Sequence, residues 1–189
     1  MIYVIGKILL SPILLLLLRP RVRGKRHLWR RGSAILVSNH WALTDPILIA
    51  LICPRIIHYM AKKELFDIKG LGPLITALGA FPVDRSKADI NAIKLSLKAV
   101  RDGRKLLIFP EGTTRHKEGD EAKEGAARIA LKTGAPILPI YISENKKFRS
   151  NVYVVIGEPF TPEPTRTKEG SRALADEIMR RIYALKETY

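Results

Sequence analysis

The sequence is poor in residues on which several common kinds of protein depend. It has one cysteine, Cys53, in 189 residues, so no disulfide can form within the chain. Cys53 follows the apolar run 47–52, where a small buried side chain is a better interpretation than a nucleophile. Only four histidines are present, and they stand in unlike contexts, whereas a metal site normally needs several such ligands. A disulfide-rich fold and a metal-dependent phosphohydrolase are both disfavoured, and we expect no metal.

Acidic and aromatic residues are also scarce. The chain has 33 Lys and Arg against 18 Asp and Glu, a formal net charge of +15. Such a charge calls for an anionic partner, which could be nucleic acid, a phosphate-bearing substrate or an acidic membrane face. Aromatic residues make up only 7% and are not interleaved with the basic ones, as they would be on a surface for single-stranded nucleic acid. We therefore expect no nucleic-acid partner.

The longest apolar run is too short for a plain transmembrane span. Residues 2–18 are apolar apart from four positions, and as a helix they would extend about 26 Å, less than the ~30 Å hydrocarbon core. A basic collar suited to anionic head groups follows; it comprises Arg19, Arg21, Arg23, Lys25, Arg26, Arg30 and Arg31. A cleaved signal peptide fits poorly, because the basic residues come after the apolar run. We expect residues 1–31 to form an apolar, membrane-anchoring helix with a basic collar, monotopic on the cytoplasmic face of an anionic phospholipid membrane. The alternative is a core helix followed by a solvated basic loop.

Residues 32–189 are expected to form a single α/β domain. Apolar runs predict strands at 33–37, 56–60, 79–85, 105–109, 135–142 and 152–156, with helices alternating between them. This alternation indicates a mostly parallel sheet flanked by helices, with possible antiparallel edges. Pro82 places the strand 79–85 at an edge, because proline cannot donate to a strand ladder. A helix after a capping box at 86–89 would bury Ile90, Ile93, Leu97 and Val100.

A histidine and an aspartate stand five positions apart in the stretch 38–46. His40 follows the strand 33–37, and Asp45-Pro46 is a strong helix start, because an Asp oxygen can cap free N–H groups and Pro fits the first turn. An imidazole with a carboxylate on its far nitrogen is suited to act as a general base. The alternative is a helix-capping Asp beside an ordinary surface His.

A second block, residues 108–115, follows the buried strand 105–109. Its sequence is Ile-Phe-Pro-Glu-Gly-Thr-Thr-Arg. Two loops that each follow an apolar strand can converge at one edge of a parallel sheet, where open α/β folds build their sites. Gly112 would permit a tight turn there, and Glu111 would either hold that turn or position a substrate.

Four blocks in this order resemble the glycerolipid acyltransferase family. The His-x4-Asp motif matches His40 through Asp45, and Phe-Pro-Glu-Gly-Thr matches residues 109–113 letter for letter. Residues 79–85 resemble the block that ends in a phosphate-binding arginine, and 135–140 resemble the proline-containing block. Together they span residues 39–140.

The resemblance implies an enzyme, an O-acyltransferase of phospholipid biosynthesis. Its substrates would be a thioester donor, acyl-CoA or acyl-carrier protein, and a lysophospholipid acceptor, with no cofactor besides the donor. The expected reaction acylates the free sn-2 hydroxyl of 1-acyl-glycerol-3-phosphate to give phosphatidic acid; another lysophospholipid or glycerol 3-phosphate is the alternative acceptor. His40 would take the proton of that hydroxyl and Asp45 would orient the imidazole. A non-catalytic membrane binder would leave both loops unexplained.

The resemblance also implies a set of substrate-binding residues: Arg85, Glu111, Gly112, Thr113, Thr114 and Arg115. The two arginines would pair with the acceptor's phosphate, for which a forked guanidinium is well shaped. The family usually has an arginine directly after Phe-Pro-Glu-Gly-Thr, whereas Thr114 intervenes here before Arg115.

Four further residues were weighed as site candidates. If the phosphate is bound elsewhere than at the arginines, Lys62, Lys63 and Lys105 are the next candidates. His58 alternates with apolar neighbours in its strand and is interpreted as structural.

Overall fold

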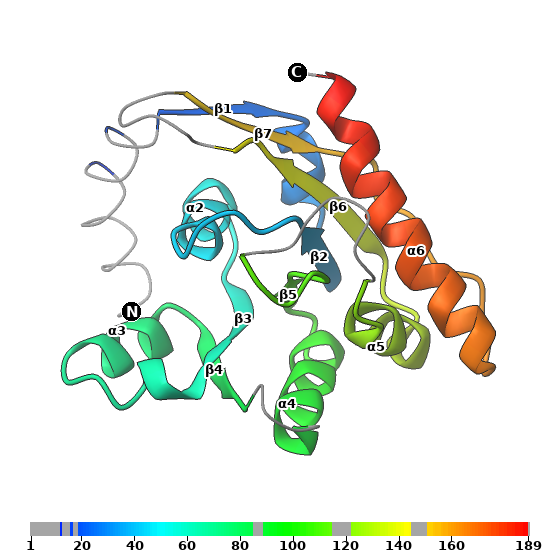
Figure 1. Ribbon diagram of the computed structural model, residues 1–189, viewed down its shortest axis with the longest axis horizontal. Coiled ribbons are helices and arrows are strands. Elements are labelled where there is room, and N and C mark those ends of the chain that lie inside the picture. The colour runs from blue at the N-terminus through cyan, green and yellow to red at the C-terminus, as the bar shows by residue number, and fades with distance from the viewer. Residues whose placement is uncertain are drawn as a thin grey trace.

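The computed structural model describes residues 19–84, 89–114, 122–144 and 151–188, together with Pro12 and Leu16. A seven-stranded sheet lies at the centre of the described part (Figure 1), in the order β1-β7-β6-β2-β5-β3-β4. Its strands are β1 (Pro20–Arg23), β2 (Ala34–Ser38), β3 (Ile57–Lys62), β4 (Ala80–Val83), β5 (Lys105–Ile108), β6 (Ile137–Ile142) and β7 (Val152–Ile156).

The strands from β6 to β4 run parallel, and the sheet becomes mixed at its other side. β7 pairs antiparallel with β6, and β1 pairs parallel with β7. The central strands β2 and β5 are buried along their whole length, as expected where helices cover both faces of a parallel sheet. β4 is an edge strand, with Pro82 opposite Ala61 of β3. The predicted mostly parallel sheet and the predicted edge position of Pro82 are both confirmed.

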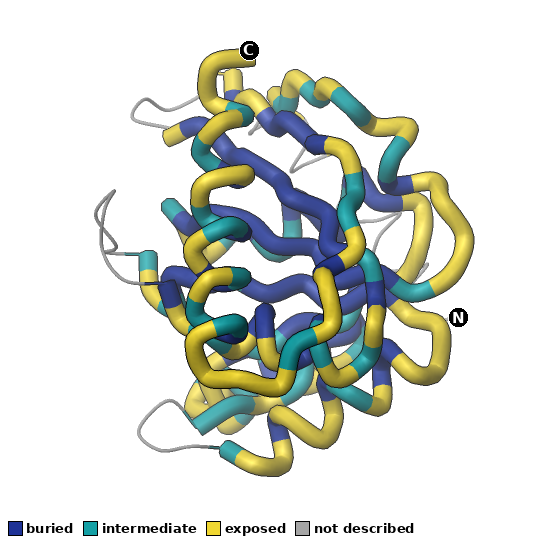
Figure 2. The backbone as a smooth tube through the Cα atoms, turned by 90° about the vertical axis from the view of Figure 1, so that its right-hand side faces the viewer, coloured by how far each residue is buried: buried dark blue, intermediate teal, exposed yellow. Residues whose placement is uncertain are grey.

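Helices cover both faces of the sheet. α2 (Asp45–Ile52) and α3 (Leu71–Ala77) contribute to one hydrophobic cluster; α4 (Ile90–Arg101), α5 (Gly125–Thr133) and α6 (Lys168–Ala184) contribute to the other. Neighbouring residues of one strand divide between the clusters: Leu36 packs with the first and Ile35 with the second. Figure 2 shows the strands as the buried interior between more exposed outer segments. Three short 3₁₀ segments complete the described elements: η1 (Lys25–Trp29), η2 (Lys63–Leu65) and η3 (Leu185–Thr188).

The buried face of α4 agrees with the prediction at Leu97 and Val100, which pack in the second cluster, but not at Ile90 and Ile93. Ile90 and Ile93 are 64% and 44% exposed, and the residues that α4 buries are Ala92, Ser96, Ala99 and Val100. The small residues let the helix lie close to the sheet, which the spacing of the large apolar residues did not reveal. The helix begins at Asp89, whose side chain accepts the N–H of Ala92 at 3.0 Å; Ser86 lies outside the described residues. α5 ends at Thr133, and Gly134 takes a left-handed conformation after its last turn.

Part of the expected basic collar belongs to the sheet. Pro20–Arg23 form β1, which pairs with β7, and Leu28 of η1 is fully buried. The predicted apolar anchor at residues 2–18 lies outside the described residues, except for Pro12 and Leu16. Within the described ranges, no helix combines the length and apolar character needed to cross a bilayer. The anchor and the boundary at residue 31 stay predictions.

Candidate active site

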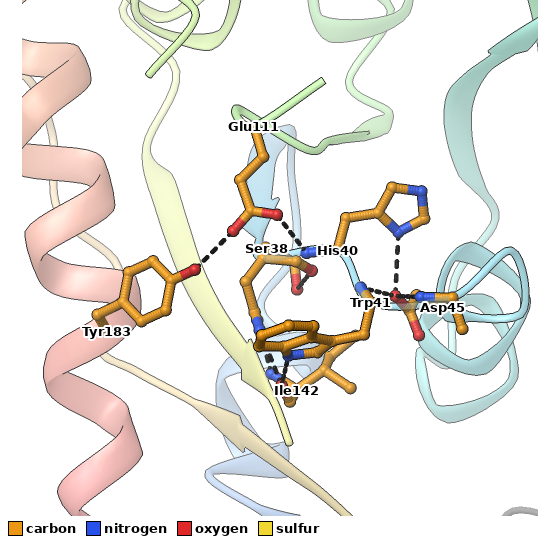
Figure 3. Close-up of polar contacts among 9 residues, drawn as sticks. Ser38, His40, Trp41, Asp45, Glu111, Ile142 and Tyr183 are labelled. Atoms are coloured by element: carbon orange, nitrogen blue, oxygen red, sulfur yellow. Dashed lines mark hydrogen bonds and ion pairs between the residues drawn. The ribbon is translucent and has the colours of Figure 1, made fainter. Parts of the chain in front are cut away.

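The loops after β2 and β5 meet at the carboxyl edge of the sheet. Val37 and Ile108 are paired in register, so the segments that follow them start side by side. The His40 ring stacks on Phe109, with ring centroids 4.1 Å apart and an interplanar angle of 22°. The backbone N–H of His40 donates to Oε2 of Glu111 at 2.9 Å (Figure 3). The predicted convergence of the two motif loops is therefore present in the fold.

His40 and Asp45 form a hydrogen-bonded pair. Nδ1 of His40 lies 3.0 Å from Oδ2 of Asp45, and both side chains are almost completely buried. Oδ2 also accepts the backbone N–H groups of Trp41 at 2.7 Å and Ala42 at 2.8 Å. Because an ionised carboxylate only accepts, Nδ1 carries the proton and Nε2 keeps its lone pair. This tautomer can take a proton from a substrate.

The predicted capping role of Asp45 is wrong. The N-cap of α2 is Thr44, and Asp45 and Pro46 occupy the first two helical positions. The Asp45 carboxylate turns back toward the loop that precedes the helix, where three donors converge on Oδ2. Asp45-Pro46 correctly predicted where the helix starts, but the carboxylate fixes the loop and the imidazole instead of the helix end.

Asn39 anchors the loop after β2, a role that sequence analysis missed. Its side-chain amide donates to the carbonyl of Ile142 and accepts the N–H of the same residue, both at 2.8 Å. Trp41 Nε1 donates to the same carbonyl at 2.9 Å. The amide thus continues the pairing of β2 with β6 beyond the last strand residue. The motif placed Asn39 beside His40, but its partner lies 103 positions away in the chain.

Glu111 connects the loop after β2 to α6. Its Oε1 accepts the hydroxyl of Tyr183 in α6 at 2.8 Å, while its Oε2 accepts the N–H of His40. The Glu111 residue is only 4% exposed. These contacts support the interpretation in which Glu111 holds the turn, and they identify Tyr183 as a second residue that sequence analysis missed.

Gly112 makes the tight turn that its position predicted. Its φ is +70°, and its N–H donates to the carbonyl of Phe109 at 3.0 Å. A Cβ added at Gly112 would lie 2.5 Å from Nζ of Lys123, so the lysine side chain passes directly over this glycine. The backbone N–H of Lys123 donates to the carbonyl of Pro110 at 2.9 Å, which fixes Lys123 against the motif turn.

A cavity of about 240 Å³ opens beside His40. Its walls are mostly apolar and come from the carboxyl ends of β3, β4 and β5 and from the start of α5. The polar side chains that line it are His40, Asp84 and Lys123. The His40–Asp45 pair therefore lies at the side of a mostly apolar cavity.

The remaining predicted binding residues are not placed at this cavity. Arg85 and Arg115 lie outside the described residues, although Asp84, next to Arg85, lines the cavity. Thr113 is exposed and Thr114 is half-buried, and neither is among the residues that line it.

The lysines and His58 divide between the two ends of the sheet. Nζ of Lys63 pairs with Oδ2 of Asp84 at 2.7 Å, and this contact raises the pKa of Lys63. Lys105, a reserve candidate for the phosphate, is instead buried at the amino end of β5, where desolvation lowers its pKa. His58 contacts Arg104 at 3.0 Å, and partial burial lowers its pKa, in agreement with the structural interpretation. Among the described residues, no group of three or more His, Cys, Asp or Glu is arranged to hold a metal ion.

Comparisons with known proteins agree with this geometry. A family model described as Acyltransferase matches residues 19–143. The 1-acyl-sn-glycerol-3-phosphate acyltransferase of Bacillus subtilis is 34% identical over 177 residues, covering 88% of this chain and 87% of that protein. The human 1-acyl-sn-glycerol-3-phosphate acyltransferase beta is 30% identical, covering 69% of this chain and 49% of that protein. The crystal structure of the 1-acyl-sn-glycerophosphate (LPA) acyltransferase from Thermotoga maritima superposes with a TM-score of 0.71 at 27% identity, covering 98% of this chain and 78% of the other.

Proposed function

The chain belongs to the acyltransferase family and is an O-acyltransferase, and on that premise we propose that it acylates the free sn-2 hydroxyl of 1-acyl-glycerol-3-phosphate. The product is phosphatidic acid, an intermediate of phospholipid biosynthesis. The observation that carries the proposal is the His40–Asp45 pair beside an apolar cavity, in a chain whose relatives are named for this reaction.

His40 acts as the general base. Its Nε2 takes the proton of the acceptor hydroxyl as the oxygen attacks the thioester carbonyl, and the tetrahedral intermediate then expels the donor's thiolate, which takes up the proton. Asp45 keeps the proton on Nδ1 and stabilises the imidazolium that forms in between. Transfer is direct, so no covalent acyl-enzyme is needed. General base catalysis of this kind typically contributes about 10²–10⁴-fold.

The acyl donor is a thioester carried by coenzyme A or by acyl-carrier protein. Both carriers present the same reacting group, and the apolar walls of the cavity suit the hydrocarbon next to the carbonyl. The two donors differ only in the carrier, so the purified protein has to be offered both of them.

Arg85 and Arg115 pair with the acceptor's phosphate in this proposal. Arg85 directly follows Asp84 of the cavity wall, and Arg115 ends the second motif block. A phosphate monoester carries more charge than the diester of a zwitterionic lysolipid, so charge-assisted pairing favours the monoester.

The enzyme works at the cytoplasmic face of an anionic membrane, held there by residues 1–31. The chain has 33 basic and 18 acidic residues, and this positive net charge supports attraction to anionic lipid. The acceptor and the product are themselves membrane lipids.

The proposal is tested with purified protein, a panel of lysolipids and glycerol 3-phosphate as acceptors, and both donors, with lipid products identified by mass spectrometry. We expect phosphatidic acid from 1-acyl-glycerol-3-phosphate, and its loss in His40→Ala. A folded wild-type protein that acylates only a different acceptor would replace the proposed substrate with that acceptor. A protein that releases free fatty acid and no acylated lipid would contradict the reaction itself.

A further inference from the structure

The chemistry of the acceptor restricts where its phosphate can lie. In 1-acyl-glycerol-3-phosphate the sn-2 hydroxyl and the phosphorus are separated by only a few covalent bonds. When the hydroxyl is within hydrogen-bond reach of His40, the phosphate must therefore lie in or at the mouth of the same small cavity. The cationic groups around this cavity are the candidates for binding it.

Lys123 is the one Lys or Arg among the described residues that line the cavity. Its Nζ lies over Gly112 of the motif turn, and its own N–H is bonded to Pro110, so the side chain starts from a fixed backbone. The residue is exposed, and within the described ranges its ammonium has no carboxylate partner. Nearby Arg128, by contrast, pairs with Glu124 at 3.0 Å.

The acidic side chain of the cavity does not oppose an anion there. Asp84 is the carboxylate among the lining residues, and its Oδ2 is paired with Lys63 at 2.7 Å. The charge of Asp84 is thereby offset by Lys63, whereas Lys123 has no such partner among the described residues. The first turn of α5 also faces the cavity through Gly125 and Ala126, and the N–H groups of a first helical turn have no partner within the helix.

We propose that Lys123 binds the phosphate of the acceptor and sets its distance from His40. The ammonium pairs with the phosphate at the cavity mouth, with the start of α5 as a second, weaker source of positive potential. The inference rests on the proposed function, because it names a further residue for the recognition of that acceptor. It makes Lys123 a determinant of acceptor specificity, distinct from the catalytic pair.

The test compares two acceptors that differ only in the phosphate: 1-acyl-glycerol-3-phosphate and the matching monoacylglycerol. Lys123→Met keeps the aliphatic stem and removes the charge, and Lys123→Arg keeps the charge. We expect Lys123→Met to raise KM for the phosphate-bearing acceptor about 10- to 100-fold, the loss of one charge-assisted pair. KM for the donor and the rate with monoacylglycerol should stay unchanged, and Lys123→Arg should restore most of the loss.

Lys132→Met is the matched control. Lys132 lies near the end of α5, whereas Lys123 precedes that helix, and Lys132 lines a separate groove together with Thr165 and Lys168. The Lys132→Met variant should therefore behave as wild type. Thermal unfolding of each variant checks the fold, and Lys123→Gln provides a second charge-free variant.

Three outcomes distinguish a failure of the proposed function from a failure of the proposed role of Lys123. A wild-type protein with no activity toward 1-acyl-glycerol-3-phosphate would overturn the proposed function. A wild-type protein with that activity whose Lys123→Met and Lys123→Gln variants keep the acceptor KM would overturn only the role of Lys123. Equal loss of kcat with both acceptors would place Lys123 at the reacting acyl group, which also overturns the phosphate assignment.

Discussion

The hydroxyl of Tyr183 donates to Oε1 of Glu111 at 2.8 Å, and this contact links α6 to the loop after β5. The other oxygen of the same carboxylate accepts the N–H of His40 at 2.9 Å. The two oxygens of the Glu111 carboxylate are thus held by partners from different elements. A change at Tyr183 alone can therefore distinguish a structural role of Glu111 from direct contact with the substrate.

Tyr183→Phe removes one partner of Glu111 and leaves the His40–Asp45 pair intact. We expect the free energy of unfolding to fall by about 1–3 kcal/mol, because Oε1 loses its donor in a buried position. We also expect a several-fold lower kcat with little change in either KM. Denaturant unfolding and steady-state kinetics measure the two effects. Unchanged kcat in a destabilised variant would show that the contact serves stability alone.

His40→Ala should abolish acyl transfer, and Asp45→Asn should leave a residual rate. Loss of the base removes the proton acceptor, an effect of about 10²–10⁴-fold, whereas an amide at position 45 still offers an oxygen to the loop N–H groups. Turnover of both variants with saturating substrates is the measurement. Near-normal turnover in His40→Ala would end the proposed mechanism.

Asn39→Ala should destabilise the fold and slow catalysis. It leaves both backbone groups of Ile142 without the Asn39 amide, at a cost of about 1–3 kcal/mol for each buried group that stays unpaired. Asn91→Ala, at an exposed position of α4, is the matched control and should be close to neutral. Urea denaturation compares the two variants. Equal stability of both would contradict this prediction and mean that water pairs with the N–H of Ile142 in place of the lost amide.

The burial of Lys105 makes the free energy of unfolding vary with pH in the alkaline range. Desolvation is the largest cause of its lowered pKa, with Arg55 acting in the same direction and Cys53 against it. Below the pKa that Lys105 has in the folded state, the lysine is charged in both the folded and the unfolded chain. The cost of burying this charge then lowers the free energy of unfolding in full. Between that pKa and the ordinary lysine value of about 10.4, the unfolded chain binds more protons, so the free energy of unfolding rises with pH.

Lys105→Met should remove this rise and increase stability at neutral pH. Denaturant unfolding at a series of pH values from neutral upward, with exposed Lys132→Met as control, is the measurement. A wild-type curve that stays flat over this range would contradict the prediction.

Membrane binding by residues 1–18 can be separated from the integrity of the sheet. A cut just before Gly24 would also remove β1 and expose the edge of β7. We expect a chain that starts at Arg19 to keep its thermal stability and lose sedimentation with anionic phosphatidylglycerol vesicles. A chain that starts at Gly24 should be less stable. Retained vesicle binding by the Arg19 chain would place the anchor elsewhere.

Local patterns were sufficient for most elements and for the meeting of His40 with Asp45, but not for β1, whose residues were expected to belong to the basic collar. The Asp45-Pro46 signal predicted the first residue of α2, and Pro82 predicted an edge strand, because both depend on near neighbours in the chain. The convergence of the loops at residues 40 and 111 followed from the alternation of strands and helices, which places the ends of parallel strands together.

Partnerships across long sequence separations could not be predicted in the same way. The amide of Asn39 and the hydroxyl of Tyr183 find their partners 103 and 72 positions away, and no periodicity encodes those contacts. The face of α4 was misjudged for a related reason, since the close approach of Ala92 and Ser96 to the sheet outweighed the spacing of the larger apolar side chains.

The link from Tyr183 to Glu111 also sets the order in which the enzyme can become active during synthesis. His40 and Asp45 leave the ribosome early, but the β6 residue that receives Asn39 and the helix that receives Glu111 follow about a hundred or more residues later. A nascent chain that ends before α6 lacks the hydroxyl that steadies the turn under the imidazole. The contacts around His40 are therefore complete only when α6 has been translated and has docked.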